Sequence, residues 1–420
     1  MKILHISSSD YQGGAARAAY RIHRALVEYG IDSRMRVLYS GTDDDRVTAG
    51  AKSRSMIDRL ALKLYDRWLN YTHRGWYTEN PILHTFGQIS AGLADEINAS
   101  DADVVNLHWI SKMMSVKDIG RLKKPIVWRL ADMWAFCGGE HYAPVDPESR
   151  FIKGYLSSNR PLGERGPDLN RQTWLAKRRA WGRQHFTIIC TTRWLADCAR
   201  QSVLFANSPI HVIPNTLDVH ETWRPINKQV ARIALNLPLD KKLILMGADW
   251  GLSNPYKGAD LLIEAIERIA SRNVDGFELV VFGQVKPTEQ AQYPCPVHWL
   301  GKVTDDRILT LAYSAADVMV VPSRQEAFGQ TASEAQACGT PVVAFGIGGL
   351  PDIVIHKETG WLAKAFDTED LAEGILWILA DAQRHASLSA ASRQEAIERF
   401  AGPVVAAKYA SIYRDVLQHP

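Results

Sequence analysis

The sequence contains few cysteines, and their arrangement predicts neither a crosslinked nor a metal-bound protein. The 420 residues include five cysteines, an odd number, and no Cys-x-x-Cys pair. This pattern argues against a disulfide framework and against a zinc site, and it fits a reducing compartment. We therefore expect a cytoplasmic protein without a bound metal.

Long apolar runs and a strong net charge are also missing. No stretch reaches the roughly 18 uninterrupted apolar residues that predict a membrane span. The N-terminal MKILHISSSDYQGG is typical of a buried first strand rather than of a signal peptide. The formal net charge is only +3, so the whole molecule shows no nucleic-acid footprint.

The chain is too long for one compact core, and its pattern predicts two domains of α/β type. Short apolar runs such as KILHIS, DVVNLHW and PIVWRLAD alternate with helical segments. The irregular HVIPNTLDVHETWRP interrupts this alternation, which restarts at KLILMGA. We expect two doubly wound, Rossmann-like domains that meet near Thr216, residues 1–216 and 217–400, with ligands bound in a cleft between them.

A dinucleotide-binding fingerprint is absent from the first strand–helix turn. The turn reads GGAARA and lacks Gly-x-Gly-x-x-Gly, and the end of the second strand, RVLYSG, offers no acidic residue for a ribose. These two features disfavour a dehydrogenase.

The most informative stretch present is RQEAFGQTASEAQACGTPVVAFGIGGLPDIV, residues 324–354. It predicts a strand ending near Pro322 and a helix from Gln330 or Thr331 to Gly339. The first-turn N–H groups and the helix dipole favour a phosphate there. Glu326 and Glu334 are at most ~12 Å apart along the axis if the span is wholly helical. That separation suits a sugar nucleotide with hydroxyls at both ends, although glutamates near a helix start also occur for structural reasons alone.

With its flanking residues, this stretch resembles the nucleotide-sugar signature of the GT4 family of retaining glycosyltransferases. The resemblance extends to IPNTLD, YKGADLLIEAI, HWLGKV and ETGWLA, and to SSSDYQGGAARAAYRIHRAL near the N-terminus. It covers most of the C-terminal half and patches of the N-terminal half. It implies the GT-B fold, with the last segment, about residues 401–420, returning to the N-terminal domain.

The resemblance also implies roles for individual residues. Glu326 would hold the donor hexose, Glu334 the ribose, and Lys257 the phosphate charge that develops as the nucleotide leaves. The remaining donor contacts would come from Phe328, Gly329, Gln330 and Thr331 at the helix start, Val303 beside the base, and Gly13 and Gly14 in the first loop. Catalytic candidates in the N-terminal domain are His108 and Asp132, and His141 lies in a loop that could meet the acceptor.

Two positions depart from the family pattern. Asp249 and Trp250 stand where many relatives carry an arginine, so one phosphate-neutralising cation is missing. Ala131 stands where relatives often have the histidine of a His-Asp pair, while Asp132 remains. Arg129 shares a strand face with Ala131 and is a weak candidate to fill its space.

Two basic, aromatic stretches are candidates for peripheral contact with an anionic membrane. They are SRSMIDRLALKLYDRWLNYTHRGWY, residues 53–77, and RQTWLAKRRAWGRQHF, residues 171–186. Basic amphipathic helices can lie on such a surface. The alternative, helices packed on their own domain with a solvated basic face, is at least as well supported.

These observations predict a retaining hexosyltransferase that uses a UDP- or GDP-sugar, without a metal or other cofactor. The acceptor would be a glycan or a lipid-linked sugar, and family analogy suggests bacterial surface-polysaccharide synthesis at the inner membrane face. The alternatives are a sugar-phosphate phosphorylase or nucleotide-sugar epimerase on the same fold, and a non-catalytic nucleotide-sugar binder. The sequence does not identify the base, the sugar or the acceptor.

Overall fold

A computed structural model describes residues 1–50, 74–247, 255–272, 276–286 and 293–418. Asp249, Trp250 and most of the first basic stretch, residues 53–73, lie outside the described residues. The chain divides into two compact units, Met1–Ile213 with Ala406–Pro420, and Pro214–Val405. The sequence placed the boundary near Thr216 and the return at about residue 401.

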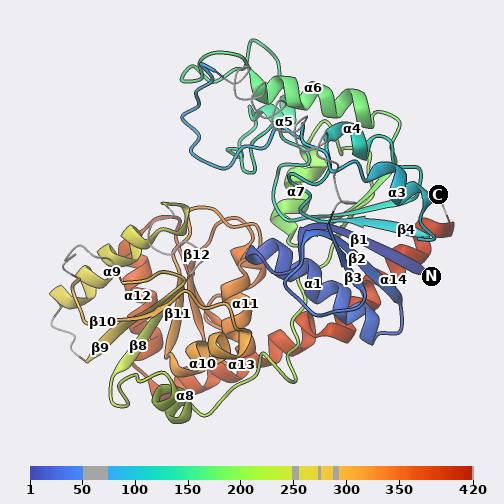
Figure 1. The fold of residues 1–420 in the computed structure, drawn as a ribbon. Helices are drawn as coiled ribbons and strands as arrows, with labels where there is room; N and C mark the ends of the chain where they lie inside the picture. The colour runs from blue at the N-terminus through green and yellow to red at the C-terminus, as the bar shows by residue number, and fades with distance from the viewer. Residues whose placement is uncertain (51–73, 248–254, 273–275, 287–292, 419–420) are drawn as a thin grey trace. The chain divides into compact units, whose positions relative to one another are not determined.

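The described part of the first unit is built on a parallel sheet of seven strands in the order β3-β2-β1-β4-β5-β6-β7 (Figure 1). Residue Ile6 of β1 pairs with Leu107 of β4, so the strand order reverses between these two strands. In doubly wound sheets a ligand binds outside the carboxyl ends of the strands at this reversal. The strands are β1 (Lys2–Ser9), β2 (Asp32–Tyr39), β3 (Val47–Ala49), β4 (Val104–Leu107), β5 (Ile126–Leu130), β6 (Phe186–Cys190) and β7 (Ile210–Val212).

Helices connect these strands and cover both faces of the sheet. The amphipathic α1 buries Ala18, Ala19, Ile22 and Leu26, which recur at helical spacing. The helices of this unit are α1 (Gly13–Glu28), α3 (Ala94–Ala99), α4 (Val116–Ile119), α5 (Arg150–Lys153), α6 (Leu169–Trp181), α7 (Arg193–Gln201) and the returning α14 (Gly402–Gln418).

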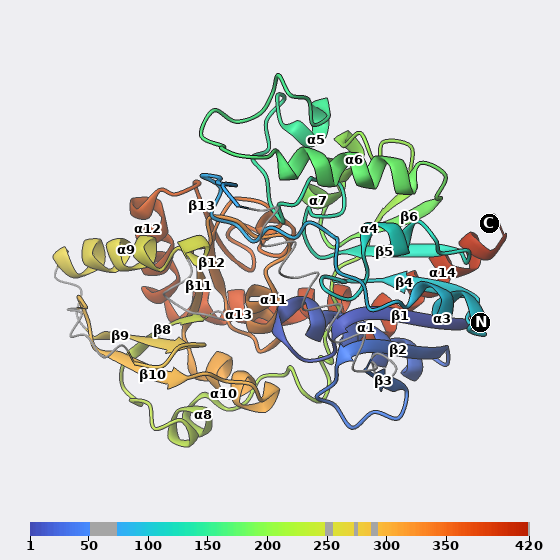
Figure 2. The ribbon, with the colours of Figure 1, turned by 45° about the horizontal axis from the view of Figure 1, so that its top comes forward.

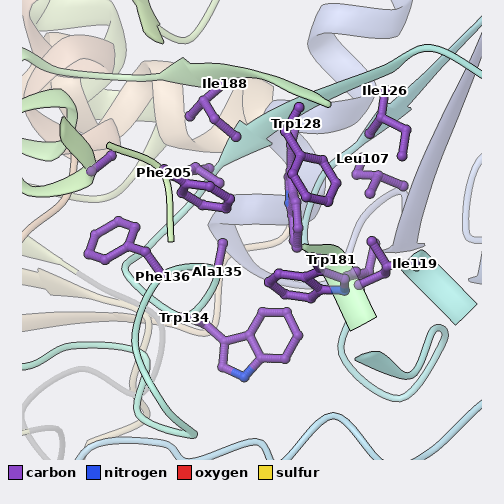
Figure 3. Packing of buried hydrophobic residues seen from close by; sticks show 14 of the residues in the cluster. Leu107, Ile119, Ile126, Trp128, Trp134, Ala135, Phe136, Trp181, Ile188 and Phe205 are labelled. Atoms are coloured by element: carbon purple, nitrogen blue, oxygen red, sulfur yellow. The ribbon is translucent and has the colours of Figure 1, made fainter. Parts of the chain in front are cut away.

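The core of the first unit is rich in aromatic side chains (Figure 3). Trp128 of β5 lies 5.4 Å, between ring centroids, from Trp181 of α6 in an edge-to-face arrangement. Phe205 also contacts the Trp128 ring, with 6.3 Å between the ring centroids. These contacts fix α6 against the sheet, and through α6 they fix the loop that follows β5.

The second unit repeats the same topology with a parallel sheet of six strands in its described part, in the order β10-β9-β8-β11-β12-β13. Figure 2 shows β8, β9 and β10 side by side. Residue Leu245 of β8 pairs with Met319 of β11, where the order reverses. The strands are β8 (Lys242–Gly247), β9 (Phe277–Phe282), β10 (Val297–Gly301), β11 (Val318–Val321), β12 (Val342–Phe345) and β13 (Gly360–Ala363).

The helices of the second unit include one that the sequence analysis did not separate. We expected helices around 367–384 and from about 401, and a long helix, α13, lies between them. The α-helices are α8 (Lys228–Ala234), α9 (Ala259–Ser271), α10 (Asp306–Ala315), α11 (Gln330–Ala337), α12 (Thr368–Leu379) and α13 (Ala382–Phe400), with 3₁₀ turns at η2 (Pro255–Lys257) and η3 (Leu350–Asp352). Within the described residues, no helix is both long enough and apolar enough to cross a membrane.

Both units therefore show the strand order of Rossmann-like folds. This confirms the predicted α/β class with two doubly wound domains. All five cysteines are free, and all but Cys295 are buried.

Candidate functional site

The candidate site of the second unit lies at the reversal of its strand order. Lys257 lies in η2, which follows β8 in the sequence, and Glu326 lies between β11 and α11. Because β8 and β11 are adjacent and parallel, their carboxyl ends lie at the same edge of the sheet. Lys257 and Glu326 form an ion pair there, with 2.7 Å between Nζ and Oε2.

Arg324 holds the turn η2 against the segment that follows β11. Its backbone N–H donates to the carbonyl of Tyr256, and its guanidinium donates to the carbonyl of Pro255 at 2.9 Å and to the carboxylate of Asp260. These bonds fix the turn that carries Lys257 against the segment that carries Glu326. The position of the lysine therefore results from several contacts and not from the ion pair alone.

Two glycines allow the backbones at this site to approach closely. Gly258 has φ +66°, and a Cβ there would lie 1.9 Å from the carbonyl oxygen of Pro322. Gly348 has φ +52°, and a Cβ there would lie 2.3 Å from the carbonyl oxygen of Glu326. Any other residue would push Lys257 or Glu326 out of place.

Helix α11 begins at Gln330 and provides an N-terminus suited to an anion. Gly329 precedes it with φ +97°, and neither a side-chain cap nor an acidic residue occupies the first turn. The first N–H groups of a helix have no partner within the helix, and the dipole places positive potential there. Gln330 and Thr331 are half-buried, whereas Phe328 is buried and packs against Phe400 at 6.0 Å between ring centroids.

The second predicted carboxylate, Glu334, is buried inside α11. Its Oε2 accepts a hydrogen bond from the hydroxyl of Tyr313 at 2.9 Å. Glu326 is also mostly covered, with 15% of its side chain exposed. Neither carboxylate points into bulk water. Val303 is partly buried against the core of this unit. The ribose and base contacts assigned to Glu334 and Val303 stay predictions.

In the first unit, Gly13 and Gly14 begin helix α1 directly after β1. Gly13 has φ +81° and open space where a Cβ would lie. No acidic residue lies in the first turn, so this N-terminus also suits an anion. A contact between these glycines and a diphosphate stays a prediction.

His108, a catalytic candidate, lies in the core of the first unit. Its Nε2 lies 2.8 Å from Nδ1 of His5, and the amide of Asn106 contacts both rings at 3.2 Å. The same amide donates to the hydroxyl of Tyr413 in α14. Burial, and secondarily the neighbouring His5, holds the pKa of His108 well below its usual value. Asn106 thus links this pair of histidines to the returning helix, and the catalytic role of His108 stays a prediction.

Asp132, the other catalytic candidate, is paired with His141. Its Oδ2 lies 2.7 Å from Nδ1 of His141, and Nε2 of the same ring lies 2.8 Å from the hydroxyl of Thr85. The sequence placed His141 only in a nearby loop. Arg129 is buried, and burial lowers its pKa, while Tyr409 of α14 and Asp132 oppose that shift.

Lys177 of α6 holds the loop between Asp132 and His141, and the sequence analysis missed this role. Its ammonium donates to the carbonyls of Trp134, Cys137 and Gly138. It also lies 3.8 Å from the centroid of the Trp134 ring. Burial lowers the pKa of Lys177 to about 7.

This arrangement also bears on the second basic, aromatic stretch. Within α6, Trp174, Lys177 and Trp181 are buried, while Arg178 and Arg179 are exposed. The aromatic side chains pack into their own unit and leave a basic, solvated face. For residues 171–186, the contacts therefore support a helix packed on its own domain rather than a helix lying on a membrane.

A family model matches part of the second unit. Residues 227–395 match the family model described as glycosyl transferases group 1. This range includes Lys257, Glu326 and Glu334, so the second unit contains a group 1 glycosyltransferase domain.

Curated relatives match over about half of their length. A D-inositol 3-phosphate glycosyltransferase of Xylanimonas cellulosilytica is 37% identical over 221 residues, which are 49% of this chain and 51% of that protein. One from Mycobacteroides abscessus is 37% identical over 166 residues, or 37% of this chain and 36% of that protein. The chain thus spans about half or less of the length of these relatives.

Solved structures match over the whole chain. A sucrose-phosphate synthase of Thermosynechococcus elongatus has a TM-score of 0.68 at 18% identity, covering 100% of both chains. An Anabaena protein in complex with UDP and glucose has a TM-score of 0.65 at 16% identity, covering 99% of both chains. At these identities the likeness shows the fold, which is that of GT-B glycosyltransferases.

Proposed function

We propose that the protein is a retaining hexosyltransferase that takes a sugar from a nucleoside-diphosphate donor. The observation that carries the proposal is the ion pair between Lys257 and Glu326 beside the N-terminus of α11. The helix start favours a diphosphate, and in this proposal the Lys257 ammonium neutralises the charge that develops as the nucleoside diphosphate leaves. Preorganised donors of this kind are usually the main catalytic contribution, each worth roughly 3 kcal/mol.

The pair also suggests how the donor is recognised. Without a ligand, Lys257 neutralises Glu326, so neither charge is unpaired in a partly buried site. A diphosphate would attract the ammonium and leave the carboxylate to accept hydrogen bonds from hexose hydroxyls. The presence of UDP in the Anabaena structure supports UDP-sugars as the first donors to test, with GDP-sugars second.

The acceptor in this proposal is a glycan or a lipid-linked sugar, in surface-polysaccharide synthesis at the cytoplasmic face of the membrane. The names of the curated relatives add phosphorylated inositol as an acceptor to test. No metal is assigned to the reaction, because the cationic groups above supply the neutralising charge.

The test is a thermal-shift panel of UDP, GDP and ADP and their hexose conjugates. A ligand that binds the folded state stabilises it according to its affinity, so the correct base should give the largest shift. Lys257→Ala should reduce the shift, and Lys364→Ala, which removes an exposed lysine of the same unit, should not. If no nucleotide stabilises the wild-type protein, the proposal is wrong. The anomeric configuration of the product, compared with that of the donor sugar, then tests whether the transfer is retaining.

A further inference from the structure

Phe366 of the second unit has a backbone conformation that bulky residues rarely adopt. Among the described residues, a positive φ at a position other than glycine occurs at Lys112, Asn236, Lys357 and Phe366. The φ of Phe366 is +62°, and half of this residue, 50%, is exposed. A side chain in this left-handed region crowds its own backbone, so the conformation is strained. Such strain persists where the surrounding structure imposes it, and it clusters at functional sites.

The turn that contains Phe366 is held at both ends. It lies between β13 and α12, and the N–H of Asp367 donates to the carbonyl of Lys364 at 3.1 Å. The N–H of Lys364 donates to the carboxylate of Asp370 at 2.9 Å, and the side chain of Asp367 caps the start of α12. A four-residue turn with a positive φ at its third position favours glycine there. The two anchored ends impose that conformation on Phe366.

The ring of Phe366 packs against the end of β12. Its centroid lies 5.8 Å from that of Phe345 in an edge-to-face arrangement, and Phe345 is the last residue of β12 and is fully buried. The next residue, Gly346, donates its N–H to the carbonyl of Ala363 at the end of β13, at 2.7 Å. The ring contact and this hydrogen bond together fix the direction in which the chain leaves β12.

The segment that leaves β12, residues 346–350, supports the candidate site. The N–H of Gly349 donates to the carbonyl of Glu326 at 2.8 Å. At Gly329, the residue before α11, an added Cβ would lie 2.8 Å from Cδ2 of Leu350, so these two residues are in close contact. The segment therefore packs against both the backbone of Glu326 and the start of α11.

We propose that Phe366 is a positioning residue of the candidate donor site. Its ring fixes residues 346–350, and these in turn hold Glu326 and the start of α11. A glycine would relieve the strain of the turn but would leave Phe345 without its ring contact, so the phenylalanine exchanges stability for a fixed site. The inference rests on the proposed function, since the site that it supports is the proposed donor site.

Two substitutions in the full chain separate the ring from the strain. Phe366→Ala and Phe366→Gly both remove the ring, but only the alanine variant keeps a Cβ at a positive φ. Phe366→Gly should therefore unfold roughly 2–4 °C above Phe366→Ala. Both should weaken donor binding at least about threefold, and Phe366→Tyr, which keeps the ring, should restore it. Titration calorimetry measures binding of UDP-glucose, or of GDP-glucose or ADP-glucose if that compound gives the larger thermal shift.

Hydrogen exchange followed by mass spectrometry gives a readout that needs no substrate. The N–H groups of residues 346–350 should exchange faster in Phe366→Ala and Phe366→Gly than in the wild-type protein, at a temperature at which all three are folded. Lys357→Gly is the matched control, because its φ is +64° and it precedes β13, at the opposite edge of the sheet. The control should leave both the exchange of this segment and donor binding unchanged.

The proposal is overturned if residues 346–350 exchange at the wild-type rate in both ring-deletion variants, or if they exchange faster while donor binding is unchanged. Weaker binding in Lys357→Gly would also overturn it, because the loss would then come from relieved strain and not from the ring. Nucleotide stabilisation of the wild-type protein with unchanged exchange contradicts only the role of Phe366. Faster exchange without any nucleotide stabilisation contradicts only the proposed transferase.

Discussion

Lys257 and Glu326 are separated by 69 positions in the sequence, and their side-chain nitrogen and oxygen atoms lie 2.7 Å apart. The contact exists because β8 and β11 are parallel neighbours in the sheet and therefore end at the same edge. A helix N-terminus with no acidic residue of its own lies next to this pair. The local charge therefore favours an anion that interacts with both the lysine and the helix.

We predict that Lys257→Ala and Glu326→Ala each lower turnover at least tenfold while the fold is kept. The lysine variant loses charge neutralisation of the leaving group, and a tenfold loss corresponds to about 1.4 kcal/mol in the barrier. Steady-state kinetics with the donor identified by thermal shift measures the effect, and Lys364→Ala is the matched control. Wild-type rates in both variants would show that the site is assigned wrongly.

Gly258→Ala should destabilise the second unit and weaken donor binding together. The new Cβ would meet the carbonyl of Pro322 at 1.9 Å, and the backbone has φ +66°. Gly276→Ala is the control, because Gly276 has φ +85° but nothing within 4 Å of its Cβ position. The control variant should lose about 1 kcal/mol of unfolding free energy from backbone strain alone. Gly258→Ala should lose clearly more, and urea denaturation of both variants measures the difference. Equal losses would mean that the loop adjusts freely.

The unfolding free energy should fall as the pH drops from about 6.5 towards 4, partly because of His23. Burial lowers the pKa of this histidine to about 4, although Asp44 nearby opposes the shift. The unfolded state then binds a proton that the folded state excludes, so stability is lost as the pH falls through this window and not above it. The contribution is at most about 3 kcal/mol.

His23→Gln tests this assignment. Chemical denaturation at several pH values should show a smaller slope below pH 6.5 in the variant than in the wild-type protein. An unchanged slope would mean that other groups, such as the buried His5 and His108, produce the acid sensitivity.

Tyr413→Phe should cost more stability than Tyr409→Phe, although the two tyrosines are one helical turn apart in α14. The Tyr413 hydroxyl accepts a hydrogen bond from buried Asn106 at 3.0 Å, and losing such a bond costs about 1 kcal/mol. The Tyr409 hydroxyl is buried without a hydrogen bond among the described residues, so its removal should be neutral or stabilising. Thermal unfolding of both variants compares them directly, and a larger loss for Tyr409→Phe would contradict this account of α14.

The repeated strand–helix alternation and the start of α11 could be predicted from the sequence, because apolar periodicity and the positions of glycines indicate both. It predicted Lys257 and Glu326 as separate contacts to a ligand but not their mutual ion pair. That bond depends on strand order, which periodicity does not specify. The hydrogen bond between Glu334 and Tyr313 could not be predicted either, since Tyr313 belongs to a different helix.

Other features gave a weak or misleading signal. Helix α13 buries Leu388, Ser392, Ala396 and Phe400, and two of these four residues are too small or too polar to mark an apolar face. Lys177 looked like part of a solvated basic face because nothing local indicates that three carbonyls surround it. The bond between Asp132 and His141 closes a loop of irregular backbone, which no residue pattern predicts.

The position of α14 has a consequence for how the protein is made. Asn106 and Tyr413 are separated by 307 positions, and all of Pro214–Val405 lies between the main part of the first unit and the segment that completes it. On the ribosome, the second sheet is therefore synthesised, and can close, before the first receives its last helix. Until then Asn106 lacks its partner Tyr413, so the first unit completes its core only after the second unit has been synthesised.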